Sequence, residues 1–132
     1  MVKILIIGNL GYVGSVLSNK LKSLYPQSHL IGFDIGYFCK DLTNENEINK
    51  YKIDKQYFGD VRNFDENILS DVKHVIYLAA ISNDPMGKEF IKVTKNVNCD
   101  SAIKIAHKAR ELGCKSFVFA SSCSIYGFAD NQ

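Results

Sequence analysis

Short unbroken runs of apolar residues alternate along the chain with longer segments whose apolar residues recur every three or four positions. The runs are "KILIIG", "HLIGFD", "VKHVIYLAA" and "KSFVFASS", with a weaker one at "KQYFGD". Unbroken apolar runs are typical of strands that are buried on both faces of a parallel sheet. The sequence therefore predicts five strands, at 3–8, 29–34, 55–60, 72–80 and 115–122.

The segments between these runs carry the helical spacing. The first has apolar residues at one helical face, followed by Pro26 where a helix should already have ended: Val13, Val16, Leu17, Leu21 and Leu24. A long helical region is predicted from about 86 to 112, and Gly113 is a natural helix stop. Shorter helices are predicted at "NFDENILSD" and just after Thr43 or Asn44.

Alternation of strands and helices, with apolar strands, indicates a parallel sheet covered by helices on both faces. Right-handed crossovers favour the strand order 3-2-1-4-5. We therefore expect an α/β, Rossmann-type doubly wound sheet that ends after its fifth strand, in a single domain over residues 1–132.

Composition narrows the function classes. The chain has 132 residues, 46% of them hydrophobic, and a formal net charge of +2. This charge is too small to indicate a nucleic-acid or anionic-membrane partner, and we expect neither. The four cysteines have no C-x-x-C spacing and no accompanying histidine cluster, so we expect no metal site: Cys39, Cys99, Cys114 and Cys123. No secretion signal is evident, and reduced thiols in the cytoplasm are the expectation.

The stretch "GNLGYVG" follows the first strand and opens the first helix. Gly8 would allow the tight turn, Gly11 would let the backbone approach a pyrophosphate, and Gly14 would let the helix pack closely on the sheet. The backbone N–H groups of the first helical turn, at Tyr12 and Val13, would attract the phosphates together with the helix dipole. A plain glycine-rich turn is the alternative interpretation.

Asp34 ends the second predicted strand, about twenty residues after the glycines. A carboxylate at this position can accept hydrogen bonds from both hydroxyls of an adenosine ribose, and it would repel the 2′-phosphate of NADP. The cofactor expected is therefore NAD. The alternative is an aspartate that simply stabilises the turn after the strand.

In this order and spacing the motifs resemble the extended short-chain dehydrogenases/reductases, in particular the NAD-dependent nucleotide-sugar epimerases and dehydratases. The resemblance covers essentially the whole chain. It rests on the G-x-x-G-x-x-G spacing, on Asp34, and on four later landmarks: "GDVRN", "YLAA", Asn98 and "FVFASSCSIYG".

The resemblance implies further cofactor contacts. Asp60 would hold the adenine amino group, with the Val61 backbone beside it. The fourth strand ends in small residues, which would leave room for the cofactor, at Leu78, Ala79 and Ala80. Asn98 would steady the active-site backbone.

By the same resemblance Ser122 takes the place of the catalytic serine or threonine, whose hydroxyl bonds the substrate oxygen at the carbon being oxidised. The family's dehydratases carry Asp-Glu directly after this position, and here Cys123 and Ser124 stand there, which argues against a sugar 4,6-dehydratase. The family's Tyr-x-x-x-Lys pair is matched only by "YKIDK" at 51–55, on the adenosine side of the fold, where we expect surface residues.

The expected function is thus the NAD-binding part of an epimerase/dehydratase-like oxidoreductase, which transfers a hydride transiently between a nucleotide-sugar carbon and NAD. We expect these 132 residues to be inactive alone, because they lack the tyrosine base. A stand-alone NAD(H)-binding module or a truncated product is the alternative. The apolar fifth strand would form an exposed sheet edge, so we expect a homo-oligomer or pairing with a C-terminal half.

Overall fold

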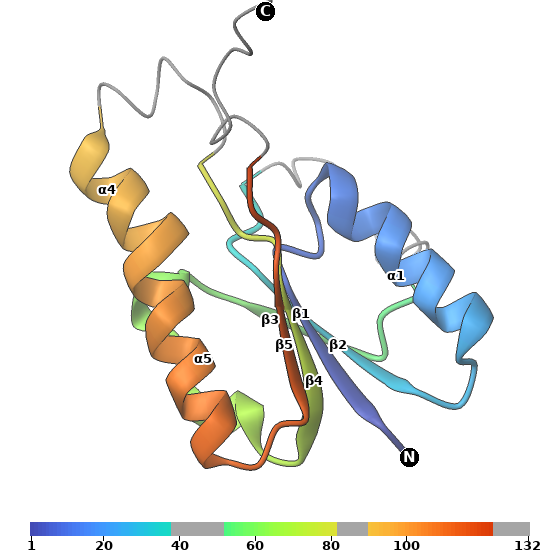
Figure 1. Ribbon diagram of the computed structural model, residues 1–132. Helices are drawn as coiled ribbons and strands as arrows, with labels where there is room; N and C mark the ends of the chain where they lie inside the picture. Colours follow the sequence, from blue (N-terminus) through green and yellow to red (C-terminus); the bar gives the residue numbers. More distant parts are fainter. Residues whose placement is uncertain (38–51, 82–89, 123–132) are drawn as a thin grey trace, which may run out of the picture.

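The computed structural model describes residues 1–37, 52–81 and 90–122. Five parallel strands form one sheet in the order β3-β2-β1-β4-β5. Helices lie on both faces of the sheet, with α1 on one side and α4 and α5 on the other (Figure 1). The strands are β1 (Lys3–Ile7), β2 (His29–Asp34), β3 (Lys55–Phe58), β4 (Val72–Tyr77) and β5 (Ser116–Phe119).

The predicted Rossmann-type sheet and its strand order are confirmed. β1 pairs with β2 on one side and with β4 on the other, so the chain reverses its direction of winding between β1 and β4. In open parallel sheets the crevice at this reversal, outside the carboxyl ends of the strands, is where ligands bind. Figure 1 shows that α1 begins at this end of the sheet and runs back along it.

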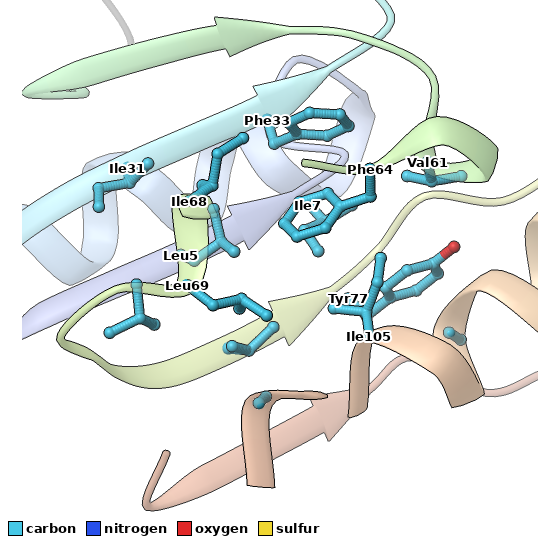
Figure 2. Packing of buried hydrophobic residues seen from close by; sticks show 14 residues of the cluster. Leu5, Ile7, Ile31, Phe33, Val61, Phe64, Ile68, Leu69, Tyr77 and Ile105 are labelled. Atoms are coloured by element: carbon cyan, nitrogen blue, oxygen red, sulfur yellow. The ribbon is translucent and has the colours of Figure 1, made fainter. Parts of the chain in front are cut away.

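The apolar run of β1 is explained by burial on both faces. Leu5 and Ile7 of β1 belong to the larger core cluster, whereas Ile4 and Ile6 of the same strand belong to the smaller cluster on the opposite face. The larger cluster is completed by side chains of β2, β4, α5 (Ser101–Glu111) and the 3₁₀ turns η1 (Val61–Asn63) and η2 (Glu66–Leu69), as Figure 2 shows.

Helix α1 (Tyr12–Leu24) occupies the predicted segment, but its two valines do not lie on its buried face, whereas Leu21 packs against the smaller core cluster. Val13 is 58% and Val16 66% exposed, whereas Gly14 and Ser18 are the buried residues. The Ser18 hydroxyl donates to the Gly14 carbonyl at 2.7 Å, which satisfies this polar group inside the helix. Small residues allow a closer approach to the sheet than valines would, so they take the inner face.

The predicted long helix is interrupted by a π-helical turn. It consists, in the described residues, of α4 (Ile91–Lys95), the π turn η3 (Asn96–Asp100) and α5. The Tyr77 hydroxyl donates to the Val97 carbonyl at 2.6 Å, inside this turn. Burial raises the pKa of Tyr77, so its phenol stays protonated and remains a donor.

The predicted short helix at 63–71 forms only the 3₁₀ turn η2. Asp65 caps this turn, because Asn67 N donates to its carboxylate at 3.0 Å. The helix predicted near Thr43 lies outside the described residues. In the part of the chain that the structure describes, no helix has the length and apolar character to cross a membrane.

An ion pair links α1 to the chain at the amino end of the sheet. Lys22 Nζ contacts Asp54 Oδ2 at 2.7 Å, and the Leu30 amide donates to the same carboxylate at 2.7 Å. Partial burial acts to raise the pKa of Asp54, but the hydrogen bonds from Lys22 and Leu30 and the nearby positive charges outweigh it and lower the pKa.

We expect Asp54→Asn to lower the free energy of unfolding at neutral pH by about 0.5–1 kcal/mol, because solvent screens an ion pair that is only partly buried. A carboxylate whose pKa is lowered on folding stabilises the protein above its unfolded pKa of about 4 and loses this contribution as the pH falls further. The difference between wild type and variant should therefore shrink below pH ~4 in urea titrations. Asp71→Asn is the control, because Asp71 is 78% exposed and its ion pair with Lys3, at 3.6 Å, should contribute little. An equal loss in both variants would contradict the role of Asp54.

Candidate functional site

The glycine-rich loop starts with a backbone position that requires glycine. Gly8 has φ +87°, and its amide donates to the Phe33 carbonyl at 2.8 Å. A Cβ at Gly8 would lie 2.6 Å from the backbone nitrogen of Ala79 and 2.8 Å from the carbonyl carbon of Leu78. The end of β1 thus passes directly against the chain that leaves β4, and only glycine permits both features.

Gly14 is required by the packing of α1 on the loop. A Cβ there would lie 2.5 Å from Asn9 Cα and 2.7 Å from the Asn9 carbonyl carbon, and it would also overlap the Gly8 carbonyl oxygen. These are backbone atoms, which cannot move aside as a flexible side chain can. The first turn of α1 therefore sits on the loop with no room for a methyl group.

Gly11 differs from the other two glycines, because the protein itself leaves room at this position. Its φ is −75°, and a Cβ would meet only the Gly8 carbonyl oxygen, at 3.4 Å. Gly11 is the N-cap of α1, where no side chain caps the helix and no acidic residue lies in the first turn. The site thus combines an open backbone surface with the positive end of a thirteen-residue helix.

Asp34, at the end of β2, lies beside this loop and is tied to it. Leu10 N donates to Asp34 Oδ2 at 3.0 Å, and Gly36 N donates to Asp34 Oδ1 at 2.8 Å. Each carboxylate oxygen has two acceptor sites, so each can accept a further hydrogen bond. The side chain is half-buried and held in one orientation, as a carboxylate that binds a diol must be.

Asp60 follows β3 and is already paired within the protein. Arg62 Nε lies 3.0 Å from Asp60 Oδ1 and 2.9 Å from Oδ2, and Arg62 Nη2 also contacts Oδ2. These hydrogen bonds from Arg62 lower the pKa of Asp60 in spite of its partial burial. Asp60 therefore stays ionised, and any partner that it takes must share it with Arg62.

The other predicted cofactor residues are distributed around the same carboxyl ends. Val61 directs its side chain into the larger core, so only its backbone can face a ligand. Leu78 donates its amide to the Ile7 carbonyl at 2.7 Å, which places 78–80 next to the loop. Tyr12 is 92% exposed at the start of α1, and Val13 is also exposed there.

The Asn98 side chain hydrogen-bonds the backbone that leaves β4. Its Oδ1 accepts from Ile81 N at 2.8 Å, and its Nδ2 donates to the Ile81 carbonyl at 3.0 Å. The π turn that carries Asn98 is held in turn by Tyr77, which sequence reasoning missed as a contributor. Ser122 is exposed three residues beyond the end of β5, on the segment that leaves the same edge of the sheet.

The "YKIDK" segment lies elsewhere. Lys55 begins β3, at the amino end of the sheet, and its Nζ stacks over the Tyr57 ring at 4.7 Å. Outside the described residues lie Tyr51, Cys123, Ser124 and the chain after Ser124.

Cys99 and Cys114 are both free thiols. Within the described ranges, no group of three or more His, Cys, Asp or Glu side chains could hold a metal ion.

Sequence reasoning also missed Asn9 and Gln56, whose side chains meet beneath the loop. A signal for them existed. Gly32 stands in the middle of the apolar strand β2, and a glycine inside a strand often marks a close approach by another group.

Comparison with known proteins agrees with this geometry. A family model described as the NAD dependent epimerase/dehydratase family matches residues 4–132. A curated relative, the dTDP-D-glucose 4,6-dehydratase of Dictyostelium discoideum, is 31% identical over 130 residues, which is 95% of this chain and 30% of that protein.

Solved structures agree in fold. TunA, described as a novel NAD-dependent NDP-hexosamine 5,6-dehydratase, has a TM-score of 0.79 at 24% identity over 99% of this chain and 40% of its own. A UDP-glucose-4-epimerase from Stenotrophomonas maltophila, solved with NAD and formylated UDP-arabinopyranose, has a TM-score of 0.79 at 16% identity, with the same coverage. The chain thus spans less than half the length of these proteins.

Proposed function

Because the chain belongs to the NAD dependent epimerase/dehydratase family, we propose that it is the NAD-binding part of a nucleotide-sugar epimerase/dehydratase-like oxidoreductase. The observation that carries this proposal is the fixed carboxylate of Asp34 beside the open backbone of Gly11. Together they offer one acceptor for a ribose diol and one cradle for a diphosphate, at the reversal point of the sheet.

The residues present fit a dinucleotide. The pyrophosphate would lie over Gly11 and the amides of Tyr12 and Val13, where a side chain at Gly11 would fill the space. The ribose hydroxyls would donate to Asp34. When bound, NAD would supply the chemistry of a reversible hydride acceptor.

The remaining contacts follow the carboxyl ends of the strands. We assign the adenine to Asp60 and the Val61 backbone, with Arg62 sharing the Asp60 carboxylate. The backbone of Leu78, Ala79 and Ala80 would border the nicotinamide half. Gly8 and Gly14 would act indirectly, because they permit the loop geometry that the contacts need.

At the reacting end, we assign Ser122 to the substrate oxygen. A hydroxyl can donate to a ketone and accept from an alcohol, which suits a carbon that alternates between the two states. Asn98 would hold the backbone after β4 in place through its two hydrogen bonds to Ile81. Among the described residues, Ser122 is the only catalytic group that we propose.

A nucleotide sugar is the proposed substrate. Several proteins with this fold have been solved in complex with such molecules, including MoeE5 with UDP-glucose and NAD. We retain the interpretation that Cys123 and Ser124 favour epimerase or simple oxidoreductase chemistry over 4,6-dehydration. We also propose that the exposed edge at β5, with Val118 and Phe119, pairs with a second copy of the chain or with a C-terminal half.

The proposal is tested by titrating the 132-residue chain with NAD and with NADP. We expect NADP to bind at least about 30-fold more weakly, because a 2′-phosphate beside the Asp34 carboxylate would cost about 2 kcal/mol or more. Asp34→Ala should weaken NAD binding and narrow this gap. Asp71→Asn, at the opposite end of the sheet, should leave the ratio unchanged. A wild-type chain that prefers NADP would contradict the placement of the ribose at Asp34.

A further inference from the structure

A partly buried pair of side-chain amides joins the glycine-rich loop to β3. Asn9 Nδ2 donates to Gln56 Oε1 at 2.7 Å, and Gln56 Nε2 donates back to Asn9 Oδ1 at 3.2 Å. Asn9 is completely buried, at 0% exposed, and Gln56 is half-buried. The two residues are 47 positions apart in the sequence, so only the folded sheet brings them together.

The orientation of both amides is determined by the backbone. Gln56 Nε2 also donates to the Tyr57 carbonyl at 2.9 Å, and a carbonyl oxygen can only accept. The Gln56 amino group must therefore face this carbonyl and Asn9 Oδ1. Its oxygen then faces the amino group of Asn9, so neither amide can rotate by 180° without opposing like groups.

The fold leaves space for this pair at Gly32 of β2, which lies opposite Gln56 in the strand register. A Cβ at Gly32 would lie 2.5 Å from Asn9 Nδ2 and would overlap Gln56 Oε1. The two amides thus occupy the space that a side chain at Gly32 would fill.

Asn9 stands between the two features that the proposed cofactor would need. Gly8 precedes it, with the left-handed turn, and Leu10 follows it, with the amide that binds Asp34. Because the Asn9 side chain is anchored, the backbone on either side of it is restrained. This backbone leads to the phosphate cradle and carries the amide that binds the ribose carboxylate. Asn9 is fully covered and so cannot contact the cofactor itself.

We infer that Asn9 and Gln56 are positioning residues for dinucleotide binding: their paired amides hold the main chain of residues 8–11 in its binding conformation. This inference rests on the proposed NAD function. The proposed role differs from plain stabilisation, because it predicts a loss of affinity in a variant that keeps its stability.

The test is the double variant Asn9→Leu/Gln56→Met in the 132-residue chain. Replacing both partners of a buried hydrogen-bonded pair by apolar groups of similar shape can be nearly neutral for stability. We expect the urea midpoint to stay close to wild type, the Kd for NAD to rise at least ~10-fold, and the Leu10 and Gly11 amides to exchange faster with deuterium. Asn9→Ala/Gln56→Ala is the second variant if the first double variant does not fold, because it also removes both amides and cannot overfill the space at Gly32. It should shift Kd and exchange in the same direction.

Ser28→Ala is the matched control. Ser28 is 6% exposed and its hydroxyl donates to the Tyr25 carbonyl at 2.6 Å, near the opposite end of β2. Its loss should lower stability but leave the Kd for NAD within twofold of wild type.

A folded double variant with wild-type Kd and unchanged exchange of the loop amides would overturn the inference and leave the proposed function standing. If the wild-type chain does not bind NAD, the proposed function fails, and the role of the pair in cofactor binding fails with it. Faster exchange of Leu10 and Gly11 in the variant would then show only that the amides order the loop.

Discussion

Replacing Gly11 with valine is expected to abolish NAD binding while leaving the fold intact. The backbone at Gly11 has φ −75° and ψ 177°, which a β-branched residue adopts readily, and a Cβ there meets only one protein atom, at 3.4 Å. The added methyl groups would instead fill the surface that we assign to the pyrophosphate. A loss of at least ~100-fold in affinity is expected, since the phosphates could no longer reach the amides of α1.

This prediction is checked by calorimetric titration with NAD, together with urea unfolding of the same variant. Gly11→Ala provides a graded comparison, with a smaller loss of affinity for a smaller side chain. Gly113→Ala serves as a remote control for binding. Gly113 lies after α5 with φ +76°, so alanine should lower stability by about 1 kcal/mol, but no other group approaches it within 4 Å and the Kd for NAD should not change. Near-normal NAD affinity in folded Gly11→Val would show that the cofactor does not lie over this loop.

Replacing Gly14 with alanine is expected to have the opposite pattern: the fold itself should be lost or severely weakened. Alanine normally stabilises a helix interior by about 1 kcal/mol relative to glycine. Here its methyl group would overlap backbone atoms of Gly8 and Asn9, so α1 would have to move off the loop. We expect the free energy of unfolding to fall by about 3 kcal/mol or more, a large part of the stability of a small domain.

The matched control for Gly14→Ala is Gly11→Ala, which is the same substitution three residues earlier. Circular dichroism during urea unfolding should separate the two, with Gly11→Ala close to wild type. If Gly14→Ala unfolds at the wild-type urea concentration, α1 can shift at little cost, and the close packing of its first turn is not essential.

The sequence by itself predicted the sheet and its strand order, and it pointed to the glycines and to Asp34 that lie together at the candidate site. Unbroken apolar runs identified β1, β2 and β4, because a strand buried on both faces must be apolar at consecutive positions. β5 was found from a similar run although most of it is exposed, and β3 from a weaker pattern. The strand order was favoured by right-handed crossovers, which nearly all parallel strand pairs adopt because the strands of L-polypeptides twist in one hand. The glycine spacing and Asp34 were visible for the same reason: each depends on a residue type placed at the end of a predicted strand.

Tertiary structure decided the features that depend on residues far apart in the chain. The valines of α1 indicated a helix correctly but not its buried face, which the approach to the loop assigned to Gly14 and Ser18. The π turn around Asn98 could not be read from the helical pattern, because one of its carbonyls is satisfied by Tyr77 from β4.

The same holds for the two polar clusters at the site. Arg62 on Asp60 is a local contact, yet whether an arginine turns inward or toward solvent is not set by its position in a motif. Asn9 meets Gln56 only because β1, β2 and β3 are neighbours and Gly32 leaves a space between them. Periodicity reports which side of an element is apolar; it carries no information on which polar groups meet once the elements are packed, and hydrogen-bond partners must therefore be taken from the structure.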